Sequence, residues 1–409
     1  MKKIWKYGCG VLAILCTVAL SFVCYWEIKL PQSFKVEKHE ELYIDTQITA
    51  KQHTLQNGVK TVSSDTNGNY RSQLYWCGIF PVKEVSVSTV DSSVVTIGGT
   101  PFGIKLYTDG VLIVSLSDVI TENGKCSPSK DCGIKTGDRI LSIDGKEVFT
   151  NKEVAALVEN CGGKALKLAI SRGGVTSTFV LQPAFSKDEQ KYKAGLWVRD
   201  SSAGIGTLTF YDPKTGVLGG LGHPICDVDT DEIIPISGGE IVPARIYSVG
   251  KSTAGSPGEL RGGFERGRLA KLSSNNMAGV YGKADVAIIG ETYPVALKQE
   301  VEEGEAKIYT TIEGTKPKWY SIRIRKVNYK GNSITRNMVI EITDPVLLEK
   351  TGGIVQGMSG SPIVQNGKLV GAVTHVLVND PTKGYAIFAE NMLETAQSVA
   401  ESNSLKEAS

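Results

Sequence analysis

The sequence predicts a mainly β protein of several domains, preceded by one membrane-spanning helix. Residues 7–26 carry no charged side chain, whereas the segments after residue 95 are short Val, Ile and Leu runs separated by Gly, Asn and Asp. Such runs with glycine-rich turns are typical of strands. A chain of 409 residues exceeds one ordinary hydrophobic core. Two or three domains are therefore expected.

The uncharged N-terminal segment is long enough to cross a membrane. Lys2, Lys3 and Lys6 precede it, and no small-residue cleavage site follows it. We expect residues 1–28 to be an uncleaved anchor, with a removable signal peptide as the alternative. Because the lysines stay in the cytoplasm, everything after residue 30 is expected on the other side of the membrane.

Composition excludes several kinds of partner. The 45 basic and 43 acidic side chains give a net charge of +2, and no basic block is interleaved with aromatics, so nucleic acid is not expected. The sequence has no metal-ligand spacing and no phosphate-binding glycine loop, so it predicts no metal and no cofactor. Cysteines outside the apolar segment are expected to be mostly free thiols, although Cys126 and Cys132 are spaced to close a small loop.

Residues 29–97 are predicted to form a juxtamembrane tether. The first part of this region is polar and poor in aromatics, and alternation that indicates a strand appears only from Trp76 to Ile97. The tether is also where a protease would find an accessible bond.

Residues 98–184 resemble a PDZ domain of the α+β class. The resemblance rests on residues 127–145, which read as a short helix, a Gly-Asp turn at Gly137 and a strand ending in Asp144-Gly145. Thr150 or Asn151 is expected to cap a helix that runs to Asn160.

The resemblance implies a peptide-binding groove, in which a loop offers N–H groups to a peptide carboxylate. The loop is expected to consist of Phe102, Gly103, Ile104 and Lys105. A PDZ scaffold that only spaces the next domain from the membrane is the alternative.

Residues 190–402 contain a long series of strand-like runs that suits a barrel or sandwich. Gly357-Met358-Ser359-Gly360-Ser361-Pro362 resembles the nucleophile segment of chymotrypsin-like peptidases, which implies a double β-barrel. By that likeness Ser359 is the nucleophile, and the N–H groups of Gly357 and Ser359 form the oxyanion hole.

The general base must be one of four histidines. His39 and His53 fall in the tether, and His375 falls within a strand, where packing or lining of the substrate site is expected. His223 lies at a turn before Ser359 and is the preferred base. A thiol peptidase using Cys226 is a rival, but Cys226 is only three residues beyond His223 on one loop.

Three places offer a carboxylate to orient the base. Asp344 closes a strand before the nucleophile loop, and Asp285 lies in an Asp-Val-Ala-Ile run that imitates chymotrypsin relatives. Asp227, Asp229 and Asp231 look like a solvated acidic loop. The residues alone do not decide between them.

Residues 219–231 and 344–390 resemble the signature stretches of the stage IV sporulation B peptidase family. The resemblance implies a triad of His223, Asp344 and Ser359. It further implies a sporulation signalling protease, exported from the forespore into the intermembrane space, that cleaves itself. Its expected partner is the membrane-bound regulatory subunit of an intramembrane metalloprotease, whose release activates a mother-cell sigma factor.

Met358 replaces the Asp that trypsin-like zymogens use for activation. We therefore expect control through the PDZ groove, which would bind the chain's own tether or a partner terminus and couple this to self-cleavage between about residues 44 and 73. The alternative function is a PDZ-based adaptor with a catalytically inactive, protease-like barrel.

Overall fold

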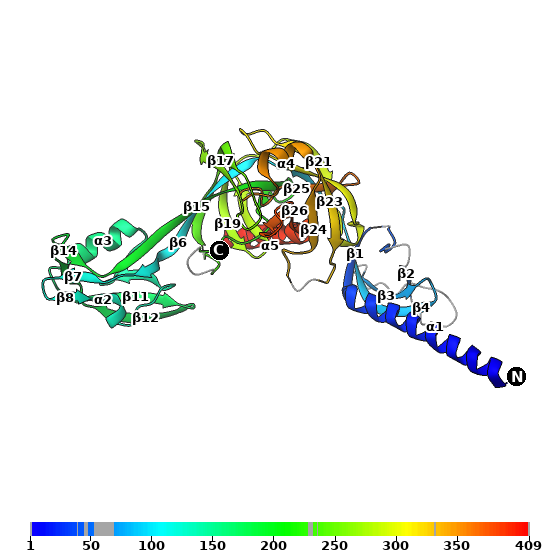
Figure 1. The fold of residues 1–409 in the computed structure, drawn as a ribbon. Coiled ribbons are helices and arrows are strands. Elements are labelled where there is room, and N and C mark those ends of the chain that lie inside the picture. The colour runs from blue at the N-terminus through cyan, green and yellow to red at the C-terminus, as the bar shows by residue number, and fades with distance from the viewer. Residues whose placement is uncertain are drawn as a thin grey trace.

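The computed structural model describes residues 2–38, 40–44, 48–52, 69–227, 232–234, 236–330 and 333–407. Figure 1 shows three bodies in a row: a helix with a small sheet, a central pair of barrels, and an outlying lobe that carries α2 and α3. The barrels lie between the N-terminal helix and the lobe. The lobe is therefore not a spacer between the N-terminal helix and the barrels.

The N-terminal body is a folded module. Helix α1 (Lys2–Lys29) leads into a sheet of order β1-β4-β3-β2, in which β1 is parallel to β4. Its strands are β1 (Ser33–Glu37), β2 (Ile48–Gln52), β3 (Tyr70–Trp76) and β4 (Phe80–Val90). Trp26 and Leu30 from the end of α1 pack with Phe34 and Leu74 in its core. The predicted loose tether was wrong for β1, β2 and β3, because alternate apolar side chains bury one face of the sheet. Strand β4 lies in the stretch from Trp76 to Ile97, where a strand was predicted.

The first barrel is a ring of six antiparallel strands in the order β6-β17-β19-β20-β16-β15, closed by pairing of β15 with β6. The strands are β6 (Pro101–Leu116), β15 (Leu196–Asp212), β16 (Val217–Gly220), β17 (Ile236–Gly250), β19 (Ala270–Asn276) and β20 (Gly279–Ala284). Phe102, Ile104 and Leu208 are fully buried in its core. Three further strands extend this sheet: β5 (Val94–Ile97), β18 (Glu259–Phe264) and β21 (Thr292–Pro294).

The second barrel is closed in the order β22-β23-β24-β27-β26-β25. Its strands are β22 (Gly304–Thr310), β23 (Lys318–Val327), β24 (Met338–Ile342), β25 (Pro362–Gln365), β26 (Lys368–Val376) and β27 (Lys383–Phe388). Its helices are η1 (Lys298–Glu300), α4 (Pro345–Thr351) and α5 (Ala389–Glu407). The predicted mainly β fold with two barrels is confirmed.

The outlying lobe has the expected PDZ elements. It contains β7 (Val119–Thr121), β8 (Gly124–Cys126), α2 (Pro128–Asp131), β9 (Arg139–Ile143), β10 (Lys146–Glu147), α3 (Asn151–Glu159), β11 (Leu166–Arg172), β12 (Val175–Leu181), β13 (Ala184–Ser186) and β14 (Lys191–Lys193). Thr150 caps α3 in a capping box with Glu153, as predicted. The sheet of the lobe is completed by the C-terminal part of β6 and the N-terminal part of β15.

The predicted peptide-binding loop is not part of this lobe. Phe102, Gly103, Ile104 and Lys105 lie in the barrel half of β6, where β15 pairs on one side and β17 on the other. The prediction was wrong because a strand paired on both edges has no N–H groups left for a peptide. Strand β6 begins in the barrel and ends in the lobe.

Candidate active site

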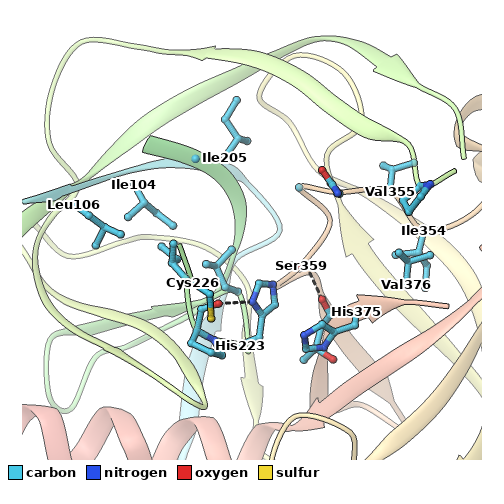
Figure 2. Close-up of a pocket in the computed structure, with 18 of the residues that line it drawn as sticks. Ile104, Leu106, Ile205, His223, Cys226, Ile354, Val355, Ser359, His375 and Val376 are labelled. Carbon is cyan, nitrogen blue, oxygen red and sulfur yellow. Dashed lines mark hydrogen bonds between the residues drawn. The ribbon is translucent and has the colours of Figure 1, made fainter. Parts of the chain in front are cut away.

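A cavity of about 710 Å³ lies between the two barrels. The first barrel contributes His223 from the loop after β16, and the second contributes Ser359 and His375 (Figure 2). Most of the remaining wall is apolar: Ile104, Leu106, Ile205, Leu221, Ile225, Ile354, Val355, Val376 and Val378. Two residues predicted from distant parts of the chain, His223 and Ser359, are thus brought to one cavity.

The nucleophile loop is held sharply bent. Gly357 and Gly360 have φ of +95° and +92°, which only glycine adopts readily. Strand β15 of the other barrel secures the loop: the Thr207 hydroxyl donates to the Gly357 carbonyl at 2.8 Å, and the Thr207 N–H donates to the Ser359 carbonyl at 2.9 Å. Sequence reasoning missed Thr207, because nothing local marks a threonine that bonds to a loop 150 residues away.

Two amides of this loop are free. The N–H groups of Met358, Gly360 and Ser361 each donate to a backbone carbonyl, whereas those of Gly357 and Ser359 have no acceptor among the described residues. These are the two amides predicted for the oxyanion hole. Free N–H groups beside the reacting carbonyl are what a developing oxyanion requires.

The Ser359 hydroxyl donates to the Thr374 carbonyl at 2.7 Å. Thr374 is held in turn, because its own hydroxyl donates to the Thr335 carbonyl at 2.8 Å. Ser361 points elsewhere: its hydroxyl bonds to the Met358 carbonyl and to the Thr310 hydroxyl inside the barrel. Ser359 is therefore the serine of this segment that faces the cavity.

His223 follows two residues in the left-handed region, Leu221 at φ +66° and Gly222 at +69°. A left-handed leucine is strained, and such strain is found where a loop must aim a side chain. His223 Nδ1 lies 2.8 Å from the Pro224 carbonyl, which fixes Nδ1 as the protonated nitrogen. Nε2 then carries the lone pair that a general base needs.

Burial lowers the pKa of His223 below its ordinary value of 6.5. Loss of solvation disfavours the imidazolium form and outweighs the opposing effect of the Pro224 carbonyl. The neutral ring therefore persists into mildly acidic solution.

His375 is the second histidine of the cavity. Its ring centroid lies 4.8 Å from that of His223, and its Nδ1 is buried with no hydrogen-bond partner among the described residues. Burial, the neighbouring His223 and Arg336 lower its pKa to about 4. This fits the predicted role of His375 in lining the site, because a neutral ring adds no charge there.

Asp344 does not reach this cavity in the structure. It is the N-cap of α4, and its carboxylate accepts N–H groups of Val346 at 3.0 Å, Leu347 at 3.1 Å and Ser321 at 3.3 Å. The predicted orienting role is contradicted by this placement. An Asp followed by Pro is itself a helix-start signal, and that signal was present in the sequence.

The other described candidate carboxylates are paired with arginines. Asp285 pairs with Arg268 at 2.7 Å. Asp227, expected in a solvated loop, is only 2% exposed and pairs with Arg199 at 2.9 Å. Arg199 lines the cavity, so this ion pair borders the site. Asp229, Asp231, His39 and His53 lie outside the described residues.

Cys226 also lines the cavity, beside His223 in Figure 2. No group of three or more His, Cys, Asp or Glu side chains suited to a metal ion occurs in the described part of the chain. The groups able to act on a carbonyl are thus one serine, one thiol and two histidines.

The lowered pKa of His223 predicts the pH dependence of any activity at this site. The base works only when neutral, so kcat/KM should fall with decreasing pH along a limb centred below pH 6.5. A pH profile with a peptide substrate measures this. A limb centred at pH 7 or above would contradict the assignment.

Substitutions of Asp344 distinguish a role as helix cap from a role in a catalytic triad. Asp344→Asn keeps a good N-cap and removes the charge, so stability and activity should stay close to the parent, whereas Asp344→Ala should cost about 1 kcal/mol. Thermal unfolding and peptide cleavage are measured together. A loss of about 10⁴-fold in kcat for Asp344→Asn would restore the carboxylate to the triad.

A second cavity, of about 570 Å³, lies in the PDZ lobe between α3 and the start of β15. Val154 and Val158 line one wall, and Leu196 and Val198 line the other. Before β15, the N–H groups of Ala194 and Gly195 have no acceptor among the described residues. This groove has the features that were wrongly expected at residues 102–105.

Known protein families match the barrels and the PDZ lobe. Residues 190–393 match the model described as SpoIVB peptidase S55, and residues 119–172 match a PDZ domain. The chain belongs to the SpoIVB peptidase S55 family. The matched residues include strands of both barrels. The serine protease class of this SpoIVB-type peptidase agrees with the cavity that contains Ser359.

Curated relatives match only part of the chain. A candidate zinc metalloprotease of Clostridium acetobutylicum is 33% identical over 70 residues, which is 17% of this chain and 21% of that protein. Another, of Neisseria meningitidis, is 30% identical over 102 residues, 24% of this chain and 22% of that protein. The chain spans about a fifth of the length of these relatives.

Solved structures resemble individual parts. The PDZ domain of an SdrC-like protein from Listeria monocytogenes is 22% identical and covers 22% of this chain and 90% of its own, with a TM-score of 0.19. The HtrA-type protease AlgW with a decapeptide is 14% identical and covers 50% of this chain and 55% of its own, with a TM-score of 0.30. The Rv3671c protease of M. tuberculosis is 12% identical and covers 48% of this chain and 84% of its own, with a TM-score of 0.27.

Proposed function

We propose that this SpoIVB-type peptidase is a membrane-anchored serine endopeptidase in which Ser359 is the nucleophile and His223 the general base. The observation that carries the proposal is the meeting of both side chains at one cavity, beside the two free amides of Gly357 and Ser359. The apolar cavity walls favour a substrate with an apolar side chain next to the scissile bond.

In the proposed reaction the Ser359 hydroxyl turns from the Thr374 carbonyl toward His223 Nε2. Nε2 takes the hydroxyl proton as Oγ bonds to the substrate carbonyl carbon, and the carbonyl oxygen becomes an oxyanion at the amides of Gly357 and Ser359. The imidazolium then gives its proton to the leaving amine as the peptide bond breaks. Water hydrolyses the acyl-enzyme by the same steps and releases Ser359.

The Pro224 carbonyl takes the place of an orienting carboxylate. It accepts the Nδ1–H bond and so keeps the lone pair on Nε2. A neutral carbonyl stabilises an imidazolium less than a carboxylate does. The resting site is therefore a dyad with a weakly supported base, which fits a protease that acts on few substrates.

For its substrates we propose the chain itself and the membrane-bound regulatory subunit of an intramembrane metalloprotease. Cleavage of that subunit would activate a mother-cell sigma factor during sporulation. Family membership and the part-length match to candidate zinc metalloproteases support this proposal. Most of the expected self-cleavage region, residues 45–47 and 53–68, lies outside the described residues.

For location we propose the forespore membrane, with the barrels in the intermembrane space and release by self-cleavage. The chain has one described helix long and apolar enough to span a membrane, Gly10–Lys29, with mean hydropathy 2.1. For peptide capture we propose the groove between α3 and residues 196–198 of β15, with the amides of Ala194 and Gly195 receiving a carboxylate.

The decisive experiment is labelling of the full chain in detergent with a serine-directed fluorophosphonate, followed by mapping of the labelled peptide. The label is expected on Ser359, to be lost in Ser359→Ala and His223→Ala, and to be kept in Cys226→Ser. Label retained in Ser359→Ala would overturn the nucleophile assignment. Loss of cleavage in Cys226→Ser alone would favour a thiol mechanism.

Two observations favour a second function, that of an inactive peptide-binding adaptor. The Ser359 hydroxyl is bonded to the Thr374 carbonyl, and no described carboxylate supports His223. An adaptor would take no fluorophosphonate label in any condition, and sporulation would proceed with Ser359→Ala. Either result would decide for the adaptor.

A further inference from the structure

The β3–β4 hairpin of the N-terminal module ends in an exposed apolar tip. Residues 74–82 contain no charged side chain, and the tip consists of residues 76–80. Ile79 is 72% exposed and Phe80 41% exposed. Cys77 and Gly78 make the turn with φ of +50° and +71°, so the tip is a defined turn between paired strands.

The tip lies against the apolar part of α1. The Trp76 ring stacks on Phe22 with centroids 4.9 Å apart and planes 4° from parallel, and the Phe80 ring contacts Trp76 at a tilt of 33° with centroids 5.6 Å apart. Figure 1 shows the strands β2, β3 and β4 beside the C-terminal part of α1. Phe22 belongs to the membrane-length segment Gly10–Lys29.

Other contacts fix this arrangement. Lys83 of β4 donates to the carbonyl of Leu30 at 2.9 Å, capping the end of α1. Trp26 and Leu30 are buried in the core of the module. The hairpin and the helix end therefore form one body, and the tip cannot leave α1 without exposing that core.

This geometry sets the depth of the tip. Phe22 precedes Lys29 by seven residues, or roughly 10 Å along a helix, whereas half of a hydrocarbon core is about 15 Å thick. When α1 spans the membrane, a tip beside Phe22 therefore lies deeper in the bilayer than Lys29. An exposed Ile and Phe at that depth contact acyl chains.

We propose that the β3–β4 tip, residues 76–80, inserts into the leaflet from which α1 emerges and forms a second membrane contact of this protein. The inference rests on the proposed membrane anchoring by α1. It makes the N-terminal module a wedge at the bilayer surface, which fixes the orientation of the attached barrels. The occupant of this apolar surface is lipid, by continuity with the apolar side of α1.

The test uses the full chain with Cys77 as its only thiol, carrying an environment-sensitive fluorophore. The protein is reconstituted in vesicles of phosphatidylethanolamine and phosphatidylglycerol, with or without nitroxide-labelled acyl chains. The fluorophore at Cys77 should lose most of its emission to the nitroxides. The same fluorophore at Asn123→Cys, an exposed turn of the PDZ lobe, should lose none.

A second variant tests the cause of the quenching. Ile79→Asp should reduce quenching at Cys77 without changing thermal stability, since Ile79 is largely exposed, whereas Ile120→Asp in the lobe should have no effect. Quenching at Cys77 no greater than at position 123 would overturn the proposal. A blue-shifted but unquenched fluorophore would also overturn it and would indicate a protein partner.

Alkaline extraction of the same vesicles separates this inference from the anchor. If the protein resists extraction but the fluorophore at Cys77 is not quenched, anchoring by α1 is supported and insertion of the tip is rejected. If the protein is extracted but the fluorophore at Cys77 was quenched, α1 is rejected as a transmembrane span and insertion of the tip is supported.

Discussion

His223→Ala is expected to lower kcat/KM for peptide cleavage by about 10⁴-fold, because it removes the base whose Nδ1 is held by the Pro224 carbonyl and whose Nε2 can accept a proton. The fold should survive, since among the described residues the ring bonds only to the carbonyl of Pro224, its neighbour in the chain. Steady-state kinetics on purified full chain, with thermal unfolding alongside, measures both effects.

The matched control is His375→Ala, which removes a ring of the same kind from the same cavity. Because Nδ1 of His375 has no described partner and its pKa is about 4, we expect a loss of no more than about tenfold. If His375→Ala were the more damaging variant, the two histidines would have to exchange roles. If neither mattered, catalysis by the two histidines of this cavity would be excluded.

Gly360→Ala is expected to destabilise the protein by more than about 3 kcal/mol or to prevent folding. A Cβ at this position would lie 2.0 Å from the Thr207 carbonyl oxygen and 2.5 Å from the Leu221 nitrogen, in a backbone with φ +92°. Both contacts are to backbone of the first barrel, which cannot rotate away. Fluorescence-detected thermal unfolding measures the loss.

Gly367→Ala is the control for backbone conformation alone. Gly367 has φ +76° with open space around its Cβ position, so the substitution should cost only about 1–2 kcal/mol. Equal destabilisation by the two substitutions would show that the contact with Thr207 does not hold the barrels together.

The elements marked by local signals could be predicted from the sequence. The N-terminal helix follows from its uncharged run, α3 from its capping residues, and the nucleophile turn from the glycines around Ser359. Each of these signals lies within a few residues of the feature that it predicts. The pairing of His223 with the Ser359 cavity followed from elimination, because so few histidines exist.

Features set by long-range contacts could not be predicted. Strand β6 reads as one PDZ segment, yet its first half belongs to the first barrel and pairs with β17, between 128 and 141 residues away. The small sheet around Leu74 buries one face only, so its sequence stays polar overall and resembles a tether. Asp344 was misassigned because a carboxylate before the nucleophile loop serves equally well as a helix cap.

Strand β15 has a mechanical consequence for the enzyme. Its first residues border the PDZ groove, and Thr207, eleven residues on, holds the nucleophile loop, about 36 Å away along an extended chain. Register shifts after Trp197 and Arg199 let the strand bend where it leaves the lobe. When the lobe tilts relative to the barrels, β15 bends at these register shifts. Tension along β15 is transmitted instead, because an extended strand cannot lengthen further. A peptide that pulls on the groove along β15 would load the Thr207 hydrogen bonds, and one that only tilts the lobe would leave them unloaded.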